Sequence, residues 1–323
     1  MTEPVGVLAM AYGTASGPDD IERYYTDIRG GRTPTAELLQ ELKERYATIG
    51  NRFPLLQTTR AQAEGMVREL NAQGEGEFRA YLGMKHSPPF IQEGVARMRE
   101  EGVQRAVGIV MAPHWSGMSV QSYVERVEKA VADGGGPAFT FVHHWYDHPL
   151  FVEFLSSRVS DALERVQTRY RDRTTVVFSA HSLPTRTVAD GTTRCKLCQS
   201  CPSGCRYVEQ LRHTADLVAA RLGLGSYTIG WQSAGRTADP WWGPSVDEVI
   251  REQAATGQRA VVVCSAGFVA DHLETLYDLD VEAVATAEQA GVAFVRTEMP
   301  NADPRFLRVL AAVVRDHLGQ VTG

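Results

Sequence analysis

The sequence predicts an α/β protein built on parallel sheets. Short apolar, β-branched runs recur along the chain, and amphipathic stretches separate them. Near-continuous apolar runs are typical of strands that are buried on both faces. Strands that alternate with helices indicate βαβ units and a doubly wound fold. The expected strands are residues 5–11, 78–84, 106–111, 139–142, 175–179, 227–231, 260–264 and 292–295.

Two of the intervening stretches have the apolar spacing of an amphipathic helix, near 3.6 residues. The first begins after Thr33 and Pro34, which are expected as the N-cap and first turn. Its apolar positions are Leu38, Leu39, Leu42, Tyr46 and Ile49. The second lies near the C-terminus, with Phe306, Leu310, Val313, Val314 and His317 on one face.

The eight strands divide into two sets of four. A boundary at Asp147-His148-Pro149 predicts an N-terminal half of residues 1–147 and a C-terminal half of residues 148–323. Each half carries a histidine just after a strand, His86 in the first and His181 in the second. Because ligands of open α/β sheets bind beyond the carboxyl ends of the strands, both histidines are expected to face one cleft.

Composition and charge narrow the class of protein. The chain has 323 residues, of which 43% are hydrophobic and 22% charged, as in an average globular protein. A net charge of −6 argues against nucleic acid or an anionic membrane as the main partner. The N-terminus lacks the features of a signal peptide, and no apolar run approaches the ~18 residues of a membrane span. We therefore expect a cytoplasmic protein, and a monomer because no coiled-coil or exposed apolar stripe is visible.

The strongest local signal is Ser-Ala-His-Ser-Leu-Pro at residues 179–184, which presents His181 at a strand end. An imidazole there can ligate a metal or accept a proton. The structural alternative is a histidine that backbone groups satisfy.

A second signal is a row of carboxylates after the strand 260–264. If residues 267–282 are helical, Glu274, Asp278 and Glu282 lie four residues apart on one face. Such a row can be a solvated helix face. It can also be a path of hard oxygen ligands for a divalent cation.

The tip of the first strand carries Tyr12 and Gly13, and Tyr12 fits either the core or the rim of a site. A single glycine is no phosphate loop, and neither G-x-G-x-x-G nor a Walker motif occurs, so a nucleotide enzyme is disfavoured. Histidines 143, 144 and 148 fit a strand end and linker better than a metal site.

Four of the five cysteines form the run Cys195-x2-Cys198-x2-Cys201-x3-Cys205, which packing does not explain. The spacing matches the ferredoxin run for iron–sulfur clusters, although Arg206 stands where proline usually follows. Structural zinc is the alternative. Cys264 lies in an expected strand and is interpreted as a plain buried thiol.

Taken together, these motifs resemble those of the ferrochelatases, and most closely the coproporphyrin III ferrochelatases. The resemblance covers nearly the whole chain except the cysteine run. The segments that carry it are residues 10–14, 21–25, 83–86, 179–184, 230–233 and 267–278.

The resemblance implies two flavodoxin-like (Rossmann-like) halves, with a porphyrin in the cleft and a C-terminal helix that returns to the first half. It implies an enzyme of haem biosynthesis that inserts Fe²⁺ into coproporphyrin III. His181 and Glu274 match the family's catalytic, metal-binding pair, and Tyr12 matches the residue on the opposite porphyrin face. Arg29, Arg45, Tyr46 and Tyr123 match positions that hold the propionates, and Glu274, Asp278 and Glu282 match the outer metal path.

The chain departs from the family pattern at two places. Phe53 stands where the nearest relatives have a propionate-binding serine. This departure removes one hydrogen-bond donor, is expected to make the pocket lip more apolar, and leaves protoporphyrin IX open as the alternative substrate. The insert at about residues 190–206 is the other departure. Some members of the wider family bind a [2Fe–2S] cluster, and this favours such a cluster over zinc on Cys195, Cys198, Cys201 and Cys205.

Other functions remain open at this point. A tetrapyrrole carrier on the same fold would bind porphyrin without turnover, and it would not need the pair His181 and Glu274. A cobalt or nickel chelatase would use the same ligand types. A plain iron–sulfur redox protein would leave the carboxylate row unexplained.

Overall fold

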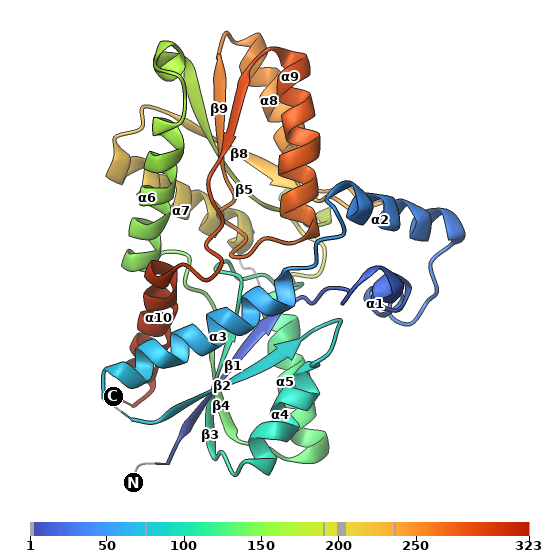
Figure 1. Ribbon diagram of the computed structural model, residues 1–323, viewed down its shortest axis with the longest axis vertical. Helices are drawn as coiled ribbons and strands as arrows, with labels where there is room; N and C mark the ends of the chain where they lie inside the picture. The colour runs from blue at the N-terminus through green and yellow to red at the C-terminus, as the bar shows by residue number, and fades with distance from the viewer. Residues whose placement is uncertain (1–2, 75, 190, 199–204, 236, 323) are drawn as a thin grey trace.

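The computed structural model describes residues 3–322 except 75, 190, 199–204 and 236, and it shows two four-stranded parallel sheets (Figure 1). The strand order of the first sheet is β2-β1-β3-β4, and that of the second is β10-β9-β5-β8. The predicted α/β class is therefore confirmed. The first sheet contains β1 (Val5–Ala11), β2 (Phe78–Met84), β3 (Arg105–Val110) and β4 (Ala138–Val142), and the second contains β5 (Thr174–His181), β8 (Tyr227–Gln232), β9 (Ala260–Cys264) and β10 (Ala293–Arg296).

Burial explains why these strands could be read from the sequence. In β1, residues 7–10 are fully buried, as is every residue of β9, because helices cover both faces of each sheet. Three strands have the predicted bounds, and the others differ by one or two residues at an end. The change that matters is at β5, which continues to His181 instead of ending at Ser179.

Helices connect the strands. Those of the N-terminal part are α1 (Ile21–Ile28), α2 (Ala36–Thr48), α3 (Leu55–Ala72), α4 (Ile91–Glu100) and α5 (Val120–Gly134). They are followed by α6 (Pro149–Glu164), α7 (Arg206–Leu222), α8 (Val246–Ala255), α9 (Val284–Ala290) and α10 (Pro304–Thr322). A small antiparallel hairpin of β6 (Thr185–Thr187) and β7 (Thr193–Cys195), two 3₁₀ turns at Pro18–Asp20 and Thr168–Arg173, and a π-helix, η3 (Thr275–Ala283), complete the described elements.

The predicted cap of α2 is wrong by two residues. Thr35, not Thr33, is the N-cap, and its Oγ1 accepts a hydrogen bond from the backbone N–H of Leu38 at 3.4 Å. Thr33 precedes Pro34, which disfavours helical geometry at that residue. A threonine three residues before the receiving N–H satisfies the helix start.

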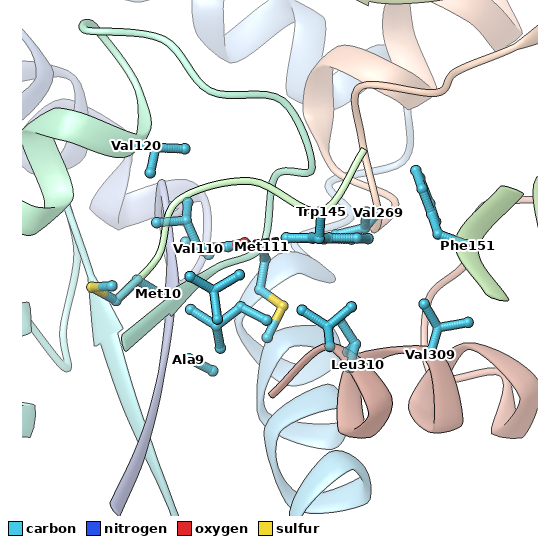
Figure 2. Packing of buried hydrophobic residues seen from close by; sticks show 14 of the residues in the cluster. Ala9, Met10, Val110, Met111, Val120, Trp145, Phe151, Val269, Val309 and Leu310 are labelled. Carbon is cyan, nitrogen blue, oxygen red and sulfur yellow. Dashed lines mark hydrogen bonds between the residues drawn. The ribbon is translucent and has the colours of Figure 1, made fainter. Parts of the chain in front are cut away.

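A buried cluster around Trp145 packs residues that follow the first sheet against helices α6 and α10. Figure 2 shows the Trp145 ring between Met111 of the first half, Phe151 of α6, Val269 of a later loop and Leu310 of α10. The indole N–H donates to the carbonyl of Val110 at 3.3 Å, and the ring meets Phe151 edge-on at 4.8 Å. The predicted boundary at residues 147 and 148 falls beside this cluster, and the division into two domains stays a prediction.

Helix α10 packs against α3 and α6, so the C-terminal segment contacts an early helix of the chain (Figure 1). Gln62 of α3 adds a polar tie, since its amide donates to the carbonyl of Val269 at 2.8 Å and to that of Asn301 at 2.9 Å. Across the residues described, no helix is both long and apolar enough to cross a membrane.

Candidate active site

The carboxyl ends of both sheets open onto one cavity of about 820 Å³. That volume lies within the range of small-molecule sites. Its walls include residues that follow β1, β2 and β3 on one side and β5, β8 and β9 on the other. Among the predicted site residues, those that line it are Tyr12, Arg29, Arg45, Tyr46, Tyr123, His181 and Glu274. The structure thus brings together side chains from positions 12 to 274.

His181 and Glu274 face each other in the cavity wall. His181 Nε2 lies 3.6 Å from Glu274 Oε1, and both side chains are about one-third exposed, at 33% and 34%. His272 approaches the other carboxylate oxygen, with its Nε2 3.4 Å from Glu274 Oε2. Nδ1 of His181 contacts the carbonyl oxygen of Ser182. Two imidazoles therefore flank one carboxylate.

These neighbours decide the charge state of the pair. Burial by itself would lower the pKa of His181, but the charge and hydrogen bond of Glu274, the hydrogen bond to Ser182 and the charge of Asp278 together outweigh burial and raise that pKa to about 9. Burial would likewise raise the pKa of Glu274, but the charge and hydrogen bond of His181, helped by His272, hold it well below its ordinary value. At neutral pH the pair is an ion pair, with the proton on His181.

The end of β5 is fixed from three sides. Gly267 lies so close to the strand that a Cβ there would stand 2.4 Å from Cβ of Ala180, so only glycine allows this approach. The buried Gln232 Oε1 accepts from Ser179 at 2.6 Å and from Ser265 at 2.9 Å, which ties β5, β8 and the chain after β9 together. The Tyr207 hydroxyl donates to the carbonyl of His181 at 3.0 Å.

The carboxylate row begins at the cavity and runs behind it. Asp278 accepts a hydrogen bond from Ser233, a cavity residue. Burial, followed by the nearby charge of Glu274, raises the pKa of Asp278 to about 7. Asp278 and Glu282 themselves are not among the cavity-lining residues. The segment that carries them is the π-helix η3, an arrangement that no pattern in the sequence indicated and that is frequent at functional sites.

Tyr12 occupies the opposite side of the cavity. It follows β1, is 42% exposed, and its ring lies 4.6 Å from that of His86. His86 is held in turn by Asp27, with 2.6 Å between Nδ1 and Oδ1. Desolvation, then the charge of Glu274, raises the pKa of Tyr12, so this side chain is a neutral phenol in the free protein.

The α1–α2 wall carries three of the four predicted propionate-binding residues, Arg29, Arg45 and Tyr46, whereas Tyr123 belongs to α5. Arg29 has a buried Nε that finds no hydrogen-bond partner among the described residues. The guanidinium carbon of Arg45 lies 4.9 Å from the centre of the Tyr277 ring, and its Nε lies 3.8 Å from Glu41 Oε1. Phe53 stacks on Tyr46 at 4.5 Å and is not a cavity-lining residue. The expectation that Phe53 makes the pocket lip more apolar is therefore wrong, because its ring packs in a small core instead.

The described cysteines of the predicted cluster converge. Cys195, Cys198 and Cys205 are buried free thiols, and Sγ of Cys195 lies 2.9 Å from Sγ of Cys205, well beyond a disulfide bond. Hydrogen bonds with Cys198 and Cys205 raise the pKa of Cys195, and hydrogen bonds with Cys195 and Cys198 lower that of Cys205. Cys201 lies outside the described residues.

The cysteine segment lies against the residues that follow β5. The backbone N–H of Lys196 donates to the carbonyl of Pro184 at 2.8 Å, and Thr185 pairs with Cys195 in the β6–β7 hairpin. Trp242 Nε1 lies 3.4 Å from Sγ of Cys195. Within the part of the chain that the structure describes, no group of three or more His, Cys, Asp or Glu side chains is arranged to hold a metal ion.

Some cavity residues were not assigned a role from the sequence. They are Lys85, His114, Tyr207, Ser233 and His272. Lys85, Ser233 and His272 lie inside the motifs that carry the family resemblance. Their position after a strand was the signal that could have indicated a place in the cavity. His114 and Tyr207 come from segments without such a motif, and only the tertiary structure brings them to the cavity.

Solved structures support the chelatase-like fold. The sirohydrochlorin chelatase SirB from Bacillus subtilis subspecies spizizenii aligns with a TM-score of 0.53 and 10% identity, covering 97% of this chain and 95% of that one. CbiX, described as the terminal enzyme for biosynthesis of sirohaem in denitrifying bacteria, aligns with a TM-score of 0.54 and 12% identity, covering 96% and 98%. At such identities the likeness concerns the fold alone.

Sequence comparison identifies the family. The coproporphyrin III ferrochelatase of Anoxybacillus flavithermus is 44% identical over 97% of this chain and 96% of its own length. That of Bacillus subtilis is 43% identical over 98% of both chains. The ferrochelatase family model matches residues 4–318. The chain is therefore an enzyme that belongs to the ferrochelatase family.

Proposed function

We propose that this protein inserts Fe²⁺ into coproporphyrin III and so forms coprohaem in haem biosynthesis. The observation that carries the proposal is that His181 and Glu274 lie together in the wall of the cavity that Tyr12 also lines. The curated relatives that share more than 40% of the sequence are named for this substrate.

The cavity suits an anionic, aromatic ligand. Arg29 and Arg45 supply positive charge, and Tyr46 and Tyr123 supply phenol groups, on walls that are otherwise largely apolar. Carboxylates pair well with the planar guanidinium fork. The buried Nε of Arg29, without a partner among the described residues, gains an acceptor when a propionate binds.

Metal insertion requires a bare ferrous ion and the removal of two pyrrole protons. We infer that Fe²⁺ reaches the cavity along Glu282, Asp278 and Glu274, since hard carboxylate oxygens suit a divalent cation. His181 must first release the proton that it holds at neutral pH, and Glu274, its ion-pair partner, helps to carry that proton away. The neutral imidazole then acts as an inner ligand or as a proton acceptor, and Glu274 balances any charge that it gains. Contacts to the propionates, remote from the ring nitrogens, can hold the macrocycle in a bent form.

The buried thiols of the cysteine segment are the observation that supports a thiolate-bound metal centre. We propose that Cys195, Cys198, Cys201 and Cys205 hold an iron–sulfur cluster, with [2Fe–2S] as the expected type and zinc as the alternative. The indole N–H of Trp242 points to Cys195, as donors around cluster sulfurs do. Such a group would cross-link the segment after β5, and Fe²⁺ insertion needs no electron from it. The monomeric, cytoplasmic state stays a prediction.

The first test is anaerobic turnover of the two candidate porphyrins with Fe²⁺, followed by the loss of free-porphyrin fluorescence. We expect coproporphyrin III to be metallated faster than protoporphyrin IX, because two more carboxylates can reach cationic walls. Preference for protoporphyrin IX would make the protein a terminal haem synthase. Tight binding without turnover of either porphyrin would favour the carrier alternative.

Replacing His181 with alanine tests the assignment of the inner residue. We expect turnover to fall about 100-fold or more, since a misplaced or missing general base normally has that effect. Porphyrin binding in the absence of metal should change far less, because the carboxylates bind elsewhere in the cavity. Turnover of His181→Ala within about twofold of the unaltered protein would refute the assignment.

The charge state of the pair predicts a pH dependence. Below pH about 9 an incoming cation must displace the proton on His181, so the apparent affinity for Fe²⁺ should fall as pH falls. Protonation of Asp278 below pH about 7 should steepen the decline. The measurement is the KM for Fe²⁺ under anaerobic conditions from about pH 6 to about pH 8.5. In Glu274→Gln the midpoint should move to lower pH, and a KM independent of pH would contradict the ion pair.

The cluster predicts a composition that can be measured without turnover. Protein purified anaerobically should contain iron and acid-labile sulfide and absorb in the visible region, and Cys195→Ser should lose all three. Cys264→Ser is the matched control, since Cys264 is a buried thiol at the end of β9. Zinc in place of iron and sulfide would select the zinc alternative, and metal-free protein would exclude both.

A further inference from the structure

Lys85 is a cavity residue to which neither the motifs nor the comparisons assign a role. Its backbone N–H donates to the carbonyl of Ala11 at 2.9 Å, which places it beside Tyr12 at the carboxyl edge of the first sheet. The side chain is half-buried and lines the cavity. An ammonium group in such a position loses hydration and has to be stabilised by its surroundings.

The neighbours of the ammonium group leave its charge uncompensated. Nζ donates to Ser122 Oγ at 2.7 Å and lies 5.2 Å from the centre of the Tyr123 ring. Across the described residues no carboxylate forms an ion pair with it. Desolvation, and then the positive charge of Arg126, lowers the pKa of Lys85 to about 8. At neutral pH the side chain is still a cation, and Glu125, whose charge acts on it, forms no ion pair with it among the described residues.

Lys85 lies on a different wall from the arginines. Arg29 and Arg45 belong to the α1–α2 segment, which projects to one side of the molecule, whereas Lys85 follows β2 and contacts α5 (Figure 1). The charges that act on Lys85 are those of Arg126 and Glu125, both in α5. The cavity therefore has two separate cationic walls.

Two cationic walls match a ligand with carboxylates on more than one side. Coproporphyrin III carries a propionate on each of its four pyrrole rings, whereas protoporphyrin IX carries propionates on only two adjacent rings. A ligand of the second kind can satisfy the α1–α2 wall, but it has no further carboxylate for the wall that carries Lys85.

We propose that Lys85 binds a propionate that only the tetracarboxylate porphyrin has, and that it thereby sets the choice between the two porphyrins. The inference rests on the proposed function and adds a specificity residue to it. The ammonium group donates to the carboxylate while Ser122 continues to hold it, and the ring of Tyr123 supports the cation from its face.

The test is equilibrium binding of metal-free porphyrins to the full chain, measured by fluorescence. In Lys85→Met, which keeps the length of the side chain but not its charge, we expect the ratio of the two dissociation constants to move about tenfold against coproporphyrin III, equivalent to about 1.4 kcal/mol. Lys85→Arg should retain most of the preference. Lys129→Met is the matched control, since Lys129 also contributes a lysine cation, on α5, but is exposed and paired with Asp133 at 2.7 Å.

The outcomes separate the inference from the function on which it rests. If Lys85→Met weakens both porphyrins by the same factor, or if Lys85→Arg loses as much preference as Lys85→Met, the inference is wrong and the proposed function stands. If the unaltered protein binds both porphyrins equally, the inference and the coproporphyrin preference fall together. A selective loss in Lys85→Met that Lys85→Arg restores supports the inference.

Discussion

The arrangement of the site depends on one topological constraint, the parallel direction of the strands in both sheets. Parallel strands release the chain at a common edge, and in this protein both such edges open onto the same cavity. Tyr12 follows β1, Lys85 follows β2, and His181 ends β5. Residues far apart in the sequence therefore meet without any long loop to carry them. The candidate site residues lie at the ends of the strands, and the buried apolar core lies along the strands themselves.

The neighbours of Glu274 explain why the pair that it forms with His181 can remain charged. An isolated carboxylate in a partly buried wall would rise in pKa, but Glu274 lies between His181 and His272, and His181 keeps the balancing proton. A preformed ion pair is neutral overall, so the fold tolerates these two side chains in a partly buried wall. On the proposed function, an incoming divalent cation would replace that proton with two positive charges, which Asp278 and Glu282 would help to balance.

Much of the fold could be predicted because it follows from local patterns. The strands are buried on both faces, so apolar runs revealed them, and His181 was found because it ends such a run. The π-helix after Glu274 was not predictable, since a π-turn differs from an α-turn in hydrogen bonding and not in composition. His114 and Tyr207 were missed for another reason: they reach the cavity only through packing between segments that are distant in the sequence. Phe53 was misinterpreted because stacking on Tyr46 decides where its ring points.

The cysteine segment contacts the backbone near His181, although the proposed reaction needs no electron from it. Metal insertion transfers no electron, so a cluster there has no step to perform. Residues of this segment nevertheless hydrogen-bond to the backbone at the end of β5 and just after it. Tyr207, two residues after Cys205, donates to the carbonyl of His181, and Lys196, next to Cys195, donates to that of Pro184. A group that cross-links these cysteines would limit the motion of the backbone on which His181 is mounted. If such a group is bound, positional control of the imidazole is the contribution we expect from it, since a proton acceptor displaced by about 1 Å can lose about 100-fold in rate.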